Sequence, residues 1–250
     1  MLKKSILAVP MLTTCLCIHA QTNNLPKYEV GFNAGSFVYQ GDLSSSAFGS
    51  LKTMKPGVSI YGSRILDNYF SVRASLSFAS LAGDDSKYPV PAWHLQRNFK
   101  FSTPVTEATA TMVWDLFGNN GRDIVTKFSP YVLAGAGYAF LNIKRDWSGV
   151  NRSIYSAGSH GGNGLAEDSA HKVPKGVFVL PIGIGVKYSF APNWAVTTEL
   201  TYRYTFSDYI DGFSKAANPS SPDGYYSFTV GLAYTFGQKN FLKCPVFKKD

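Results

Sequence analysis

Strict alternation of apolar and polar side chains constrains the fold of this chain more than any other feature. In residues 194–206, large apolar and aromatic residues dominate every second position, and small, polar or charged residues fill the positions between. Residues 226–236 repeat the pattern, with Tyr, Phe, Val and Leu opposite Ser, Thr, Gly and Ala. A period of two indicates β-strands, and about eleven residues is the length of a tilted strand that crosses a bilayer.

Six further segments alternate in the same way, though less regularly: residues 28–39, 57–65, 70–80, 99–116, 131–142 and 177–190. Together the eight segments predict an all-β fold, an eight-stranded antiparallel transmembrane β-barrel. The charged residues share the face that carries the small residues, which predicts a polar lumen and an apolar outside in contact with outer-membrane lipid. A lipocalin-like soluble barrel would need the opposite arrangement.

The lengths of the connections predict how the barrel is oriented. Short turns at residues 67–68 and 191–193, with a modest segment at 118–127, join the strands at one end. The connections at the other end are long and polar: residues 40–56, 81–98, 143–176 and 207–224. Outer-membrane barrels have short periplasmic turns and long external loops. We therefore expect a multi-pass barrel in the cell outer membrane, with both termini in the periplasm.

The N-terminus has the features of an export signal. Lys3 and Lys4 precede an uncharged, mostly apolar stretch at residues 5–18, and Ala20 offers a cleavage position. These features predict a secretory signal peptide. The chain then divides into four parts: a signal peptide at 1–20, an N-terminal periplasmic segment at 21–27, the barrel at 28–236 and a basic periplasmic C-terminal tail at 237–250.

The three cysteines lie at the two ends of the chain. Cys15 and Cys17 fall in the predicted signal peptide, and a lipoprotein is the weaker alternative because neither follows the small residue that lipid attachment usually requires. Cys244 would be the only thiol of the mature protein. A single exported cysteine can form an intermolecular disulfide, and a free thiol is the alternative.

The net charge of +8 comes partly from the tail, which carries four lysines against one aspartate. The basic residues form no stripe with interleaved stacking aromatics, which argues against a nucleic-acid partner.

Six charged residues are expected to point into the lumen: Glu29, Arg73, Glu107, Lys187, Glu199 and Arg203. An eight-stranded barrel has an interior that side chains fill, so we expect no open pore. Because an isolated buried charge costs several kcal/mol, we interpret these residues as a structural ion-pair network. A proton relay or a catalytic site is the alternative.

The histidines of the mature chain give little support to an enzyme. His94, His160 and His171 all fall in the long loops, whereas a catalytic base needs rigid elements to hold it near its nucleophile. The glycine-rich residues 158–164 favour a flexible, solvated loop over a metal or phosphate site. We expect no catalytic residues, no metal and no cofactor.

Several segments resemble a known family. Residues 39–43 (Tyr-Gln-Gly-Asp-Leu), residues 128–131 (Phe-Ser-Pro-Tyr) and residues 202–212 (Tyr-Arg-Tyr-Thr-Phe-Ser-Asp-Tyr-Ile-Asp-Gly) carry the clearest similarity. They resemble the PorG-type outer-membrane barrels of the type IX secretion system and their close barrel relatives. The family-motif residues are Gly41, Asp42, Pro130, Tyr131, Tyr202, Arg203, Tyr204, Asp208, Tyr209 and Asp211.

The resemblance implies a membrane-embedded component of a protein-export machine, with periplasmic ring proteins of the PorK and PorN type as partners. The basic tail is a plausible contact surface, through Lys239, Phe241, Lys243, Cys244 and Phe247; a solvated tail without a partner is the alternative. A second hypothesis is a structural or adhesive barrel whose external loops bind ligands through Trp93, Trp147, Tyr155 and Tyr225.

Overall fold

The computed structural model describes residues 28–44, 46, 49–90, 92–121, 127–155, 158–217 and 223–237. The predicted signal peptide, the segment 21–27 and the tail from residue 238 lie outside the described residues. Among the described helices, none has both the length and the hydropathy needed to cross a membrane.

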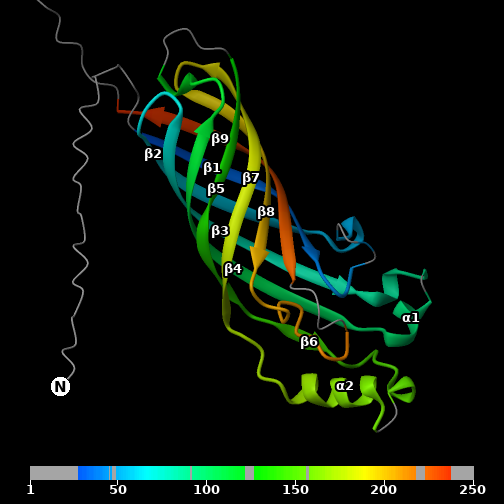
Figure 1. The fold of residues 1–250 in the computed structure, drawn as a ribbon. Helices are drawn as coiled ribbons and strands as arrows, with labels where there is room; N and C mark the ends of the chain where they lie inside the picture. The colour runs from blue at the N-terminus through cyan, green and yellow to red at the C-terminus, as the bar shows by residue number, and fades with distance from the viewer. Residues whose placement is uncertain are drawn as a thin grey trace, which may run out of the picture.

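The structure is a closed barrel of eight long antiparallel strands (Figure 1). Each strand pairs with its neighbour in the chain, and the barrel closes where β1 pairs with β9. The predicted fold class is therefore confirmed. The strands are β1 (Tyr28–Gln40), β2 (Lys55–Ile65), β3 (Phe70–Asp84), β4 (Lys100–Asp115), β5 (Phe128–Leu141), β7 (Gly176–Ala191), β8 (Trp194–Thr205) and β9 (Gly224–Phe236).

The connections between the long strands contain short helices, one short strand and 3-10 turns. In Figure 1, α1 (Trp93–Arg97), α2 (His160–Ala170) and the short strand β6 (Lys144–Asp146) gather at one end of the barrel. β6 pairs with the first residues of β4 and extends the wall there. The 3-10 turns are η1 (Leu51–Thr53), η2 (Asp85–Lys87), η3 (Asn119–Gly121) and η4 (Arg152–Ile154).

The long loops are more ordered than the sequence pattern predicts. β3 continues to Asp84, four residues past the expected end. The glycine-rich stretch expected to be flexible instead begins α2, because the Ser159 side chain caps the helix by accepting from Gly162 N. Gly164 lets the helix approach closely, since a Cβ there would lie 2.4 Å from the Lys215 carbonyl oxygen. The helix therefore packs against the β8–β9 loop.

The two faces of the barrel wall have opposite polarity. Large apolar side chains such as Ile182, Ile184, Leu200 and Leu232 are exposed on the outside, while serine, threonine and charged side chains are buried inside. A soluble protein rarely exposes a continuous apolar surface of this extent. The arrangement matches a barrel whose outer face contacts lipid.

Aromatic pairs lie near both ends of the outward face. At the end with the short turns, Phe70 stacks on Trp114 with ring centroids 6.2 Å apart, and Trp194 lies 4.9 Å from Tyr234. At the end with the long loops, Tyr204 lies 5.2 Å from Phe206. Amphipathic rings at these two levels are typical of the two interfaces of a bilayer.

Candidate functional site: the closed lumen and the loop cap

The lumen near the short-turn end is filled by a network of four charged side chains. Arg73 Nη1 donates to Glu199 Oε2 at 2.7 Å, and its Nη2 lies 4.0 Å from Glu29 Oε1. Lys187 Nζ lies 2.5 Å from Glu29 Oε2. These residues come from β1, β3, β7 and β8, so the network ties opposite sides of the wall together.

Two tyrosines complete this network. Tyr61 donates its hydroxyl proton to Glu29 at 3.2 Å, and Tyr131 donates to Glu199 at 3.0 Å. The Arg73 guanidinium lies 4.1 Å from the centroid of the Tyr61 ring. A buried guanidinium is tolerated where carboxylates and ring faces replace its water. The charged groups of this network therefore find most of their ion-pair and hydrogen-bond partners within the protein, without water.

A second ion pair lies closer to the long loops. Arg203 Nε contacts both carboxylate oxygens of Glu107, at 3.0 and 2.8 Å, and Arg203 Nη1 donates to Ser227 Oγ at 2.8 Å. The Tyr225 hydroxyl also donates to Glu107. Thr201 links the two groups, because its hydroxyl donates to Glu199 and its carbonyl accepts from Arg203. All six charged residues expected in the lumen thus lie in ion pairs there.

An apolar layer closes the barrel above the second ion pair. It is built from strand residues and from residues of the loops, which fold inward over the mouth. Its buried members include Phe37, Leu43, Leu81, Phe99, Val179, Ile210 and Phe213. The rings of Phe99 and Phe213 stack with centroids 4.4 Å apart. The interior is therefore closed twice, first by charge pairs and then by a packed core.

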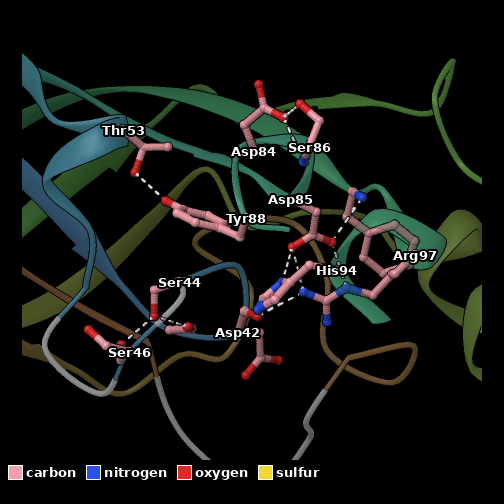
Figure 2. Close-up of polar contacts among 12 residues, drawn as sticks. Asp42, Ser44, Ser46, Thr53, Asp84, Asp85, Ser86, Tyr88, His94 and Arg97 are labelled. Carbon is pink, nitrogen blue, oxygen red and sulfur yellow. Dashed lines mark hydrogen bonds and ion pairs between the residues drawn. The ribbon is translucent and has the colours of Figure 1, made fainter. Parts of the chain in front are cut away.

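One clasp fastens the β3–β4 loop to this core (Figure 2). The buried Asp85 carboxylate accepts from Arg97 Nε at 2.7 Å, from Arg97 Nη2 at 3.0 Å and from Phe99 N at 3.0 Å. His94 Nδ1 lies 2.8 Å from the same carboxylate. Arg97 Nη2 also donates to the Asp42 carbonyl at 2.9 Å, which ties in the β1–β2 loop.

The Asp85–His94 pair has the geometry of a carboxylate that orients an imidazole, an arrangement that catalytic sites also use. A catalytic base must face a nucleophile or substrate with its other nitrogen. His94 is buried, and the centroid of its ring lies 5.5 Å from that of Tyr88 and 3.8 Å from that of Trp93. Among the described contacts, Ser44 donates to the Gly41 carbonyl and not to His94. The geometry favours a structural clasp.

A second clasp fastens the β8–β9 loop to α2. The buried Asp168 carboxylate accepts from the backbone N–H groups of Ser214, Lys215 and Ala216 at 2.8–3.1 Å. Tyr209 donates to Asp168 at 3.2 Å, and the His171 ring stacks on Tyr209 at 4.1 Å. Three backbone donors around one carboxylate form an anchoring point for the loop.

The family-motif residues separate into two groups. Pro130, Tyr131, Tyr202, Arg203 and Tyr204 belong to β5 and β8, where Tyr131 and Arg203 serve the lumen network. The other five gather in the loops above the mouth: Gly41, Asp42, Asp208, Tyr209 and Asp211. Gly41 has a direct reason to be glycine, since a Cβ there would lie 2.0 Å from Asp223 Oδ1 and 2.1 Å from the Tyr39 hydroxyl.

We call the β1–β2, β3–β4 and β8–β9 loops together with α2 the loop cap. Burial raises the pKa of three carboxyl groups in this loop cap. It is the main cause for Asp211 and Asp223, whose pKa values lie well above the ordinary range, and for Asp211 the neighbouring Asp223 charge adds to it. Burial also raises the pKa of Asp208, with the nearby Asp168 carboxylate as a further cause. Within the described residues, no group of three or more histidine, cysteine or acidic side chains is arranged to hold a metal ion.

The loop aromatics proposed as ligand contacts do not share one environment. Trp93 is 47% exposed, whereas Trp147 and Tyr155 pack against the apolar core. The expectation for Tyr225 is wrong: this residue is fully buried and bonded to Glu107. The reason is that β9 begins at Gly224, which places Tyr225 on the inward face of the strand.

Sequence reasoning missed the four aspartate and arginine residues that organise the cap. Asp85, Arg97, Asp168 and Asp223 lie in segments with no periodic pattern, so no local signal gave their orientation. The only hint is that these loops mix isolated charges with large aromatic residues, which is unusual for a solvated loop.

The fold and the interior together define a class of protein. Topology, polarity and aromatic belts define an antiparallel β-barrel of the outer-membrane type. Residues 8–236 match the model of the outer membrane protein beta-barrel domain, and the chain belongs to this family. No curated protein sequence matches it.

Three solved structures are similar at low identity. Ail, the attachment invasion locus protein of Yersinia pestis, is 11% identical over 85% of this chain and 99% of that chain, with a TM-score of 0.45. Neisserial surface protein A is 15% identical over 84% and 97% of the two chains, with a TM-score of 0.46. A major outer membrane protein from Thermus thermophilus is 12% identical over 84% and 99%, with a TM-score of 0.42.

Proposed function

We propose that this protein is an outer-membrane anchor of a type IX secretion machine, a PorG-like barrel that holds a periplasmic ring in place. The observation that carries the proposal is the doubly closed interior, with ion pairs below and a packed apolar core above. A barrel filled in this way cannot pass an exported protein through its own lumen. Its contribution to secretion would therefore be attachment.

The proposal includes an orientation. The end with α1, α2 and β6 would face the outside of the cell, and the short turns would face the periplasm, together with both termini. Periplasmic ring proteins of the PorK and PorN type would bind the short turns and the tail, where Lys239, Phe241, Lys243, Cys244 and Phe247 are the proposed contacts. These five residues lie outside the described part of the chain. The function needs no catalytic residue and no cofactor.

One observation favours a second candidate, a barrel whose loops bind an external ligand. Leu51, Val90 and Trp93 are exposed apolar side chains in the loops at the outer end of the proposed orientation. If these side chains form one patch with a ligand-binding role, they are its candidate contacts, since contiguous exposed apolar patches mark interaction sites. In this second candidate, these side chains would contact a partner outside the cell.

The test is deletion of the gene, followed by complementation with tagged versions of the chain. We expect the deletion to abolish secretion of type IX cargo, and the tagged wild-type barrel to co-purify with the ring proteins. A version that ends at Gly237 should still fold but recover much less of the ring, and Cys244→Ser should remove any reducible cross-link to a partner. Normal secretion in the deletion strain would overturn the proposal, and altered adhesion in that strain would favour the second candidate.

A further inference from the structure

The mouth of the barrel contains a buried contact between two carboxyl groups and one hydroxyl. The Tyr39 hydroxyl oxygen lies 2.7 Å from Asp211 Oδ2 and 2.6 Å from Asp223 Oδ1. All three side chains are at most 1% exposed. Tyr39 is at the end of β1, whereas Asp211 and Asp223 belong to the β8–β9 connection, so this contact holds the loop onto the wall.

If both carboxyl groups are ionised, one of the two contacts with Tyr39 lacks the proton that a hydrogen bond needs. A tyrosine hydroxyl has one proton and can donate it to one acceptor. The second contact at hydrogen-bond distance then needs a proton on the other carboxyl group, which donates it to the tyrosine oxygen. The remaining carboxyl oxygens cannot supply it, because Asp211 Oδ1 accepts from Phe213 N at 2.8 Å and Asp223 Oδ2 accepts from Ile210 N at 3.0 Å.

The surroundings also favour retention of a proton. The nearby titratable groups that act on the pair are the Asp42 carboxylate from the β1–β2 loop and Asp208 from the same connection, and both repel a second negative charge. Two arginines contact the neighbouring backbone: Arg97 donates to the Asp42 carbonyl and Arg145 to the Gly212 carbonyl. Within the described residues, neither arginine forms an ion pair with Asp211 or Asp223.

We propose that Asp211 and Asp223 share one proton through Tyr39 at neutral pH, and that this proton latches the β8–β9 loop over the mouth of the barrel. Loss of the proton leaves two buried carboxylates and one donor, and the resulting repulsion releases the loop. The latch is a pH-sensitive closure built into the long-loop end of the barrel, and it does not depend on the proposed role in secretion.

The sign of the pH dependence follows from the proton count. In the open cap both carboxyl groups are solvated, so they are ionised above the ordinary aspartate pKa of about 3.9. Above that pH the closed cap, which keeps the shared proton, binds one proton more than the open cap. Closure is therefore strongest in acid. It weakens as pH rises toward the raised pKa of the pair, with a slope of up to tenfold per pH unit for one proton.

The test is hydrogen exchange of the loop, followed by mass spectrometry of the full-length barrel in lipid and corrected for the intrinsic exchange rate at each pH. We expect the protection of residues 207–217 to fall by about tenfold or more between pH 6 and pH 9. Asp211→Asn should abolish the slope, because the amide still accepts from Phe213 N and donates to Tyr39 with no shared proton. Asp146→Asn, which changes the aspartate at the end of β6, is the matched control and should keep it.

Two results would overturn the proposal. The first is protection that is independent of pH in the wild-type protein, or equally dependent on pH in Asp211→Asn. The second is a carbon-13 spectrum of the wild-type carboxyl groups at pH 7 in which both Asp211 and Asp223 are ionised. The second measurement needs no variant, so it decides the question even if Asp211→Asn does not fold. The pH dependence of protection can also be measured in Asp223→Asn, as an independent repeat of the first test.

Discussion

Replacement of Glu107 by alanine is expected to lower the free energy of unfolding of the barrel by about 3 kcal/mol or more. The substitution leaves the Arg203 guanidinium buried, with Ser227 Oγ and the Thr201 carbonyl as its remaining partners. It also removes the acceptor of the buried Tyr225 hydroxyl. Urea unfolding from lipid vesicles, followed by tryptophan fluorescence and by the heat-dependent shift of the folded band on gels, measures the loss.

Two matched variants separate this effect from simple loss of volume. The double variant Glu107→Gln with Arg203→Met removes both charges, while the glutamine can still accept from Tyr225, so it should recover more than half of the lost stability. Lys100→Ala breaks the exposed contact with Asp84 at 3.9 Å and should change stability by less than about 1 kcal/mol. Equal stability of Glu107→Ala and the wild type would refute the view that the lumen charges support the barrel.

Replacement of Asp85 by alanine is the second change with a large expected effect, and it acts on the loops. Asp85 satisfies Arg97, Phe99 N and His94 at once. Its loss leaves the buried Arg97 cation with only the neutral Asp42 carbonyl among these acceptors, and the buried Phe99 N–H without its acceptor. We expect the β3–β4 loop to open at least about tenfold more often, while the strands stay folded.

Trypsin detects this opening, because Arg97 is buried in the closed loop and becomes a cleavage site in the open one. Mass spectrometry of timed digests should show faster cleavage after Arg97 in Asp85→Ala. Asp146→Asn, at the end of β6, keeps an acceptor for Ser148 N and should digest like the wild type. Unchanged cleavage after Arg97 in Asp85→Ala would mean that the clasp does not hold the loop.

The strands could be predicted because alternation is a local signal. β8 begins at Trp194 and β9 ends at Phe236, as the pattern predicts. The alternation also predicts which side chains of each strand face inward, so the six charged lumen residues could be named from the sequence. Their partners could not, because Arg73 on β3 meets Glu199 on β8 across the lumen only after the barrel has closed.

The loop cap could not be predicted, because its contacts join residues far apart in the sequence. Tyr39 meets Asp211 and Asp223 over separations of 172 and 184 residues. Loop segments carry no period that fixes which side chains turn inward. The two family-motif segments that contain Gly41 and Asp211 marked the region, but the reason for the glycine is its contact with Tyr39 and Asp223 in the folded chain.

The central claim is that side chains close the interior of the barrel, so that it forms no open pore. Single-channel recording of the purified wild-type barrel in a planar lipid bilayer tests this claim most directly. The ion pairs and the apolar layer predict a silent membrane after verified insertion, without conductance steps of porin size. Reproducible porin-sized steps from the wild-type barrel would contradict the account.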